Sequence, residues 1–180
     1  MNYKFMTTVL MTSAIALAGI PFTSQTAIAQ EVRFICGESF DRASGQRYPT
    51  TFAWTERGKM AVVRWKKQWS GNITPQQRCQ SVSPRFQEAY SSGTLNFITN
   101  GTANGQPVIC TATEQGGACQ TMLMTLRAED NPLQVLNQLR DVLGGRATGP
   151  VVHSSGVPQA YYRVDIENFL RTAPVEEDVK

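Results

Sequence analysis

Four cysteines that follow an export signal constrain this chain more than any other feature. The signal covers residues 1–29, where an apolar run follows Lys4, and Ala27 and Ala29 supply the small residues that signal peptidase requires. We therefore expect cleavage before Gln30. An uncleaved membrane anchor is the alternative, but the apolar run is shorter than the roughly 18 residues that span a bilayer. Outside the cytoplasm, an even number of cysteines favours disulfides over free thiols.

The positions of the cysteines favour one of the three connectivities that four cysteines permit. Cys110 and Cys119 lie close together on what reads as one hairpin, so we favour a disulfide between them and, by elimination, one between Cys36 and Cys79. The longer bridge would close a loop of about 43 residues and stabilise the fold by about 3–4 kcal/mol. A zinc site is the competing interpretation, but the chain has no C-x-x-C pair and a single histidine. We predict neither a metal nor a cofactor.

The clearest hairpin pattern lies in the first half of the exported part. Strands over Thr50–Glu56 and Lys59–Lys66 are joined by a two-residue turn, Arg57-Gly58. If Glu56 faces Lys59, alternation gathers the largest apolar residues on one face, and we expect that face to be the core side. Its members are Phe52, Trp54, Ala61, Val63 and Trp65. A strand over 31–36 precedes the hairpin, and 41–49 has the composition of a turn.

Two helices are predicted from their N-terminal signals. Thr74 followed by Pro75 and Gln77 is a capping-box pattern, and Pro84 within this helix implies a kink or the start of a second helix. Its apolar stripe is Cys79, Val82, Phe86 and Tyr90. Asn131-Pro132 begins the second helix by the same logic, and Gly144 ends it. Its buried face is Leu133, Leu136, Leu139 and Leu143, with Val142 beside them.

The remaining segments complete an α+β pattern. Leu95–Thr99 is a short strand, Asn100-Gly101 and Asn104-Gly105 are turn dipeptides, and Val108–Thr113 pairs with Cys119–Leu126. A last strand over Tyr161–Asp165 and a short helix near Glu167–Arg171 follow. We expect one α+β domain over residues 30–171, with a mainly antiparallel sheet, two principal helices and two disulfides. Residues 172–180 end in an acidic run and are expected to form a disordered tail.

Several motifs of this frame are similar to those of one known family. They are Phe34-Ile35-Cys36, Cys79-Gln80-Ser81-Val82-Ser83-Pro84-Arg85-Phe86, Gly93-Thr94-Leu95, Asn104-Gly105-Gln106-Pro107-Val108-Ile109-Cys110, Thr125-Leu126 and Asn131-Pro132. Over nearly all of its exported part, the chain resembles the circadian oscillating polypeptide domain of cyanobacteria. The resemblance implies an exported cyanobacterial protein, with membrane association as one expectation. It implies no assigned chemistry and transfers no catalytic residues.

No arrangement of residues in the sequence indicates catalysis. His153, the single histidine, lies beside Ser154 and Ser155 with Asp165 further on, but no G-x-S-x-G turn accompanies them. We interpret His153 as a surface loop residue. Two acidic pairs, Glu38 with Asp41 and Glu129 with Asp130, lie beside turns, where solvated carboxylates are expected. The prediction is therefore a protein that is not an enzyme.

A basic and aromatic stretch is the best candidate for a binding surface. No acidic residue occurs between Glu56 and Glu88, although seven basic residues do: Arg57, Lys59, Arg64, Lys66, Lys67, Arg78 and Arg85. Trp54 and Trp65 are expected in the core, whereas Trp69 lies beyond the regular pattern. The candidate partner site is Arg57, Lys59, Lys66, Lys67 and Trp69.

The function expected from these features is binding at the cell envelope or at a membrane surface. The partner is an envelope protein or an anionic membrane surface, and the small net charge makes no demand for nucleic acid. The location is extracytoplasmic: periplasm, thylakoid lumen or secreted. One alternative is a small extracytoplasmic hydrolase that uses loop residues near His153, and another is an accessory domain of an envelope enzyme.

Overall fold

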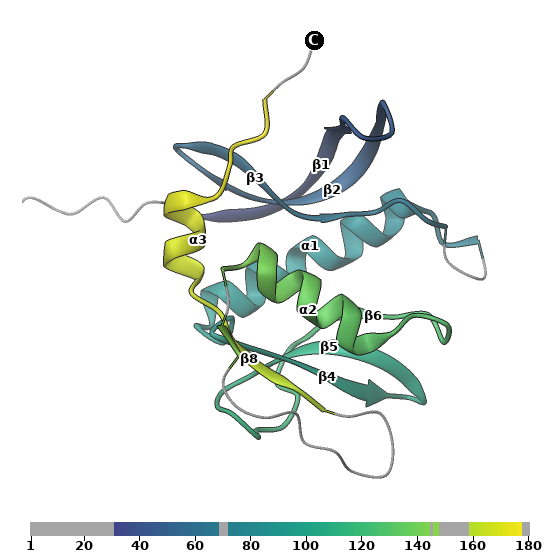
Figure 1. Cartoon of the computed structure of the whole chain (residues 1–180), viewed down its shortest axis with the longest axis vertical. Coiled ribbons are helices and arrows are strands. Elements are labelled where there is room, and N and C mark those ends of the chain that lie inside the picture. The colour runs from purple at the N-terminus through teal and green to yellow at the C-terminus, as the bar shows by residue number, and fades with distance from the viewer. Residues whose placement is uncertain (1–30, 69–71, 145, 148–158, 178–180) are drawn as a thin grey trace, which may run out of the picture.

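A computed structural model describes residues 31–68, 72–144, 146–147 and 159–177, so the predicted export signal and its cleavage site lie outside the described residues. Within this part the chain forms eight strands and three helices (Figure 1). In order they are β1 (Arg33–Asp41), β2 (Gln46–Thr55), β3 (Gly58–Arg64), α1 (Pro75–Ser91), β4 (Phe97–Ala103), β5 (Gln106–Ala112), β6 (Met122–Thr125), α2 (Pro132–Val142), β7 (Arg146–Ala147), β8 (Tyr161–Arg163) and α3 (Ile166–Thr172). None of the helices in these ranges is long and apolar enough to cross a bilayer.

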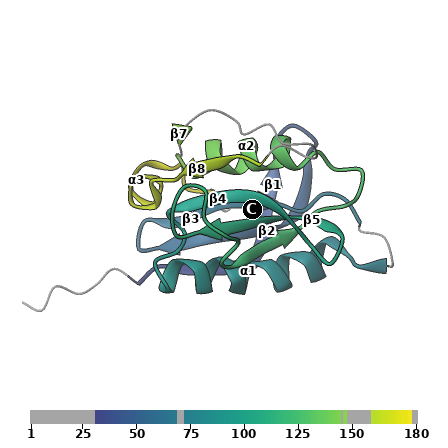
Figure 2. The same cartoon turned by 90° about the horizontal axis from the view of Figure 1, so that it is seen from below.

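The strands form two antiparallel sheets with the order β1-β2-β3 and β6-β5-β4-β8-β7. Figure 2 shows α1 along one side of the strands and α2 with α3 on the opposite side. Buried residues of both sheets and of all three helices form one hydrophobic core, in which the ring of Phe34 stacks on that of Phe86 at 5.8 Å. The predicted α+β class is confirmed, with two sheets where one was expected.

Both predicted disulfides are present. Cys36 of β1 is bonded to Cys79 of α1, and Cys110 of β5 is bonded to Cys119 in the loop before β6. The first bridge therefore joins the first sheet to the N-terminal half of the helix that packs on it. The second closes a local loop within the second sheet.

The helix signals predicted from the sequence are also confirmed. The hydroxyl of Thr74 accepts a hydrogen bond from the Gln77 N–H at 3.2 Å, and the Gln77 side chain accepts one from the Thr74 N–H at 2.8 Å. α1 runs without interruption through Pro84, so no second helix begins there. The side chain of Asn131 caps α2 by accepting from the Gln134 N–H at 3.1 Å.

The predicted register of the β2–β3 hairpin is wrong by two residues. Trp54 pairs with Lys59 instead of Ala61, and the two turn residues are Glu56 and Arg57. Because side chains alternate with a period of two, a shift of two residues leaves every side chain on its own face of the hairpin. The error lies in which face was expected to be the core side: the face that contains Trp54 is the outer one, and Trp54 is 42% exposed.

The core side of this hairpin is formed instead by Ala53, Met60 and Val62, which are all buried. The pairing with β2 skips Val62, which makes this residue a β-bulge. Because a bulge reverses the alternation of the strand, Trp65 beyond it also faces the core. Trp65 is buried, as predicted from the sequence.

Two turn assignments made from the sequence also need correction. β1 continues to Asp41 and β2 begins at Gln46, so the turn between them is much shorter than the predicted 41–49. Asn100-Gly101 lies inside β4 and is not a turn. The turn that joins β4 to β5 is Asn104-Gly105, where both residues have positive φ, 50° and 74°. This is the backbone pattern of a tight two-residue hairpin.

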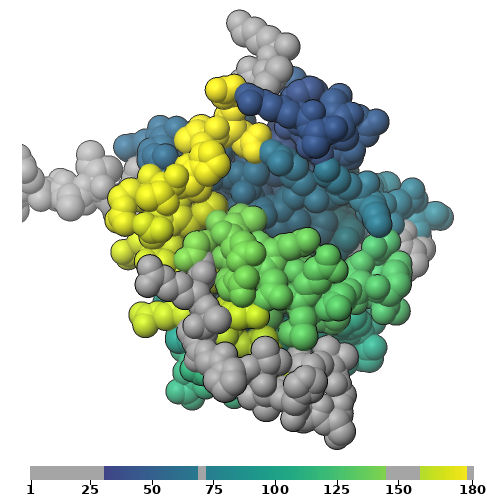
Figure 3. Space-filling view, in the orientation of Figure 1, coloured from purple at the N-terminus to yellow at the C-terminus, as the bar shows by residue number. Residues whose placement is uncertain are grey.

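The acidic end of the chain lies against the first sheet as far as the structure describes it, to Glu177. Figure 3 shows this segment in yellow beside the blue surface of the sheet. The N–H of Glu176 donates to the C=O of Lys59 at 2.8 Å, and the Glu176 carboxylate forms an ion pair with Arg64. The expectation of a solvated tail from Thr172 therefore does not describe residues 173–177.

Candidate functional site: a basic groove

A groove of about 740 Å³ separates the end of β3 from α2. Its walls are residues 63–67, Arg78 of α1, Met124 and Leu126 of the β6 region, the 127–131 loop except for residue 128, and three residues of α2, Gln134, Val135 and Gln138. We call this feature the basic groove. It lies where the two sheets and two of the helices meet, so its lining residues come from distant parts of the sequence.

Five basic and two acidic side chains line the basic groove, which gives it an excess of positive charge. Three of the cations are paired: Lys66 with Asp41, Arg64 with Glu176, and Arg127 with Asp130. The pairs of Lys66 and Arg64 use carboxylates that do not line the groove. Lys67 is exposed and has no side-chain partner among the described residues. An incoming anion would therefore meet Lys67 without first displacing a carboxylate of the protein.

Arg78 is held in place by an aromatic ring and by a main-chain carbonyl group. Its guanidinium lies over the ring of Trp65 at 4.4 Å and donates to the C=O of Thr125 at 3.0 Å. Partial burial is the main reason why the pKa of Arg78 is lowered to about 10; nearby Asp130 opposes the shift, and Arg127 adds to it to a smaller extent. This pKa leaves the guanidinium protonated at neutral pH.

Buried hydroxyl groups fix the ring on which Arg78 rests. The indole N–H of Trp65 donates to Thr51 Oγ1 at 3.1 Å, and the Ser83 hydroxyl donates to the same oxygen at 3.0 Å. Ser83 and Arg78 both belong to α1, so Trp65 is held between the helix and the first sheet. The side chains of Arg78 and Trp65 therefore lose little conformational entropy when an anion binds at Arg78, and this preorganisation favours affinity.

Arg127 and Asp130 form an ion pair in the loop that lines one side of the groove. Two bonds from the Arg127 guanidinium reach Asp130 Oδ1, at 2.6 and 3.2 Å. Hydrogen bonding with Arg127 lowers the pKa of Asp130, and the same contact raises the pKa of Arg127. Asp41, likewise expected as a solvated carboxylate, has its pKa lowered chiefly by its hydrogen bond with Lys66. Both carboxylates are thus partners of groove cations.

The basic surface continues beyond Arg78 into a smaller hollow of about 220 Å³. Arg78 and Arg85 line this hollow together with Ile73, which is 43% exposed. The two arginines are seven residues apart on α1, so they lie on the same face of the helix. Arg85 has no side-chain partner among the described residues. Lys67, Arg78 and Arg85 therefore mark out an elongated basic path.

The structure does not bring the five predicted partner-site residues together. Arg57, at the β2–β3 turn, donates to the C=O groups of Leu170 and Ala173 at 2.6 and 3.2 Å. Lys59 lies near the same turn, with its Nζ 6.0 Å from the centre of the Trp54 ring. Lys66 and Lys67 follow the other end of β3 and line the basic groove. Trp69 lies outside the described residues.

The sequence does not predict that Arg78 and the loop that contains Arg127 line the same groove. The candidate partner site omits Arg78, although the acid-free interval contains it, and it also omits Arg127. The available signal was the position of Arg78 beside Cys79. A disulfide-bonded, buried residue fixes its neighbour at a helix surface close to the first sheet.

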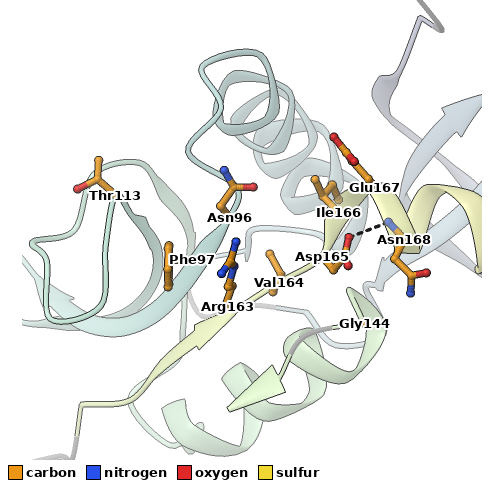
Figure 4. Close-up of a pocket in the computed structure, with 10 residues that line it drawn as sticks. All are labelled: Asn96, Phe97, Thr113, Gly144, Arg163, Val164, Asp165, Ile166, Glu167 and Asn168. Carbon is orange, nitrogen blue, oxygen red and sulfur yellow. Dashed lines mark hydrogen bonds between the residues drawn. The ribbon is translucent and has the colours of Figure 1, made fainter. Parts of the chain in front are cut away.

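A second hollow, of about 710 Å³, tests the alternative of a catalytic site (Figure 4). It contains Asp165, the predicted acidic partner of His153, but residues 153–155 lie outside the described residues. Asp165 caps α3, because its carboxylate accepts a hydrogen bond from the Asn168 N–H at 2.9 Å. In the described ranges, no three histidine, cysteine, aspartate or glutamate residues are grouped so that they could hold a metal ion.

Fold and site together define a disulfide-linked α+β domain with a basic groove, and its disulfides indicate an oxidising, extracytoplasmic environment. The model of the family described as circadian oscillating protein COP23 matches residues 33–171. The chain therefore belongs to this family. No curated protein and no solved structure matches this chain significantly.

Proposed function

We propose that this protein binds an anionic partner outside the cytoplasm through the basic groove. One observation carries the proposal: Lys67, which has no partner among the described residues, and the preorganised Arg78 line the same groove. Two cations in a concave site attract an anion more strongly than the same charges on a convex surface, because the surrounding protein excludes part of the water that screens them.

Hydrogen-bonding groups beside the cations support the same proposal. The side chains of Asn131, Gln134 and Gln138 line the wall opposite β3. Amide groups of this kind can donate to the oxygens of a carboxylate or sulfate. The combination suits a partner whose anionic groups are spaced along a chain, since Arg64 and Arg78 line the groove and Arg78 also lines the adjoining hollow that contains Arg85.

The role that we propose is binding, and it requires no catalysed reaction. We propose an interaction protein of the cell envelope, with the periplasm, the thylakoid lumen and the external medium as the compartments where its disulfides would persist. The hydrolase alternative rests on the segment around His153, and no described residue adds support to it. We therefore advance no second function.

Charge reversal at Lys67 tests the proposal, with Arg163→Glu as the matched control. Both side chains are exposed and lack a partner among the described residues, but Arg163 lines the hollow of Figure 4 instead. We expect Lys67→Glu to weaken binding of a polyglutamate peptide or of phosphatidylglycerol vesicles about tenfold at low salt, with less effect at high salt. Arg163→Glu should change it less than twofold.

Two results would contradict the proposed function. One is that the natural chain binds neither polyglutamate nor anionic vesicles at low salt. The other is that Lys67→Glu and Arg163→Glu weaken binding equally, which would show that net charge alone matters. Circular dichroism of both variants establishes that the fold is retained.

A further inference from the structure

The described end of the chain already binds a basic surface in an extended conformation. Residues 174–177 follow α3 and run across the first sheet beside β3 (Figure 1). The N–H of Glu176 donates to the C=O of Lys59 at 2.8 Å, its carboxylate pairs with Arg64, and Glu177 pairs with Arg42 at 2.9 Å. We call residues 174–177 the acidic segment.

The acidic segment lies next to the basic groove and shares a residue with it. Arg64 lines the basic groove and also the hollow that contains residues 174–177. Its guanidinium is held between Glu176 and the hydroxyl of Ser39, to which Nε donates at 2.8 Å. A ligand that runs the length of the groove therefore reaches Arg64 where the acidic segment already occupies it.

We infer that the partner of the basic groove is an acidic polypeptide in an extended conformation, and that the acidic segment occupies one end of its binding path. This inference rests on the proposed function. The main-chain bond from Glu176 to Lys59 is what favours a polypeptide. β3 is an edge strand of the first sheet, and an extended chain can continue the sheet by pairing with such an edge.

The shape of the groove disfavours a membrane as the partner. Arg78 is partly buried under the groove walls and rests on Trp65, so a flat layer of lipid headgroups would meet Lys67 before it could approach Arg78. A single extended chain fits between β3 and α2. Lipid headgroups also lack the main-chain N–H groups that pair with the edge of a strand.

The outer end of the acidic segment, at Glu177, is held weakly, which gives a longer acidic chain a place to begin displacing the segment. The side chains of Arg42 and Glu177 are 78% and 76% exposed, and ion pairs this exposed contribute little. Val175 is also partly exposed, at 36%. A partner that pairs with the same edge and continues to Lys67 and Arg78 makes all of these contacts and adds others.

Neutralisation of the acidic segment in the full exported chain tests the inference. The variant is Glu176→Gln with Glu177→Gln, and the probes are a polyglutamate peptide and phosphatidylglycerol vesicles. The control is Glu38→Gln with Glu114→Gln, which makes the same change in net charge at carboxylates without a side-chain partner among the described residues. Removing the internal competitor should tighten polyglutamate binding about tenfold, since apparent affinity scales with the fraction of open sites. The control should change it less than twofold.

Each outcome either supports or overturns one of the two proposals. Tighter peptide binding by the Glu176/Glu177 variant alone supports the inference. Equal peptide affinity in all three proteins overturns it. Binding to anionic vesicles without binding to the peptide also overturns it, but leaves the proposed function standing. If neither probe binds any of the proteins, the proposed function fails as well.

Discussion

Removal of the Cys36–Cys79 disulfide should destabilise the protein more than removal of Cys110–Cys119. Sequence separations of 43 and 9 residues correspond to stabilisation by about 4 and about 2.5 kcal/mol in the chain-entropy model. Each bridge contains one fully buried residue, Cys79 or Cys110, so replacement by alanine removes similar packing from both. The difference in unfolding free energy between the two double-alanine variants should therefore be about 1.5 kcal/mol.

Urea unfolding of the oxidised proteins, followed by tryptophan fluorescence, measures this difference directly. The same variants give a second readout, because Cys79 follows Arg78 and its bridge ties that part of α1 to β1. Loss of the long bridge should weaken polyglutamate binding, and loss of the short bridge should leave it unchanged. The reasoning is refuted if the short bridge costs as much stability as the long one, or if the long-bridge variant loses less than about 1 kcal/mol.

Two further predictions concern the cations of the groove and the segment beside it. The pKa values of Asp41 and Asp130 are lowered by hydrogen bonds to Lys66 and Arg127, so both carboxylates stabilise the fold above their ordinary pKa and lose this contribution as the pH falls through the lowered one. Unfolding free energy measured by urea should therefore drop below about pH 4, and less steeply in Asp41→Asn with Asp130→Asn; an unchanged pH profile would contradict this. Gly58 has φ 126° and an added Cβ would collide with Val175, so Gly58→Ala should cost about 1–2 kcal/mol and speed amide hydrogen exchange at Glu176. Unaltered exchange at Glu176 would show that the acidic segment does not depend on this close approach.

The helices and disulfides could be predicted because their signals are local. Thr74 and Gln77 specify a helix start within four residues, and Asn131 does the same for α2. Cys110 and Cys119 are close in sequence on either side of a Gly-rich loop, which leaves the other two cysteines to pair. Each of these signals is between neighbours in the chain, and only the Cys36–Cys79 bridge follows by elimination.

The register of the β2–β3 hairpin could not be predicted because two turns compete for it. Arg57-Gly58 and Glu56-Arg57 differ by one residue as turns, which shifts the pairing by two residues and leaves the same side chains on each face. Gly58 indicates a turn in either case, since its φ of 126° is one that glycine adopts readily. Both faces carry apolar residues, so the pattern does not show which face is the core side. The bulge at Val62 then places Trp65 on the core side, and a bulge has no signature in a single sequence.

The groove could be predicted only in part, because half of its wall comes from distant residues. The acid-free interval contains Arg64, Lys66, Lys67 and Arg78, and all four line the groove. The opposite wall is made by α2 and the loop before it, which only the packing of the second sheet brings there. The acid-free interval therefore predicts where positive charge accumulates, but it does not predict the concave shape that could bind an anion.

Composition alone gives the wrong expectation for the acidic segment, because it ignores the basic residues elsewhere in the chain that bind the carboxylates. A run of carboxylates at a chain end is expected to be solvated when no opposing charge is at hand. This chain also carries a long interval without acidic residues, and Arg64 and the main chain of Lys59, both in that interval, hold Glu176. Because Arg64 also lines the groove, occupancy by the acidic segment and binding of the proposed partner must be linked. In this proposal, whatever weakens the hold on Glu176 raises the fraction of open sites and strengthens binding in the groove in proportion, until the segment is fully released.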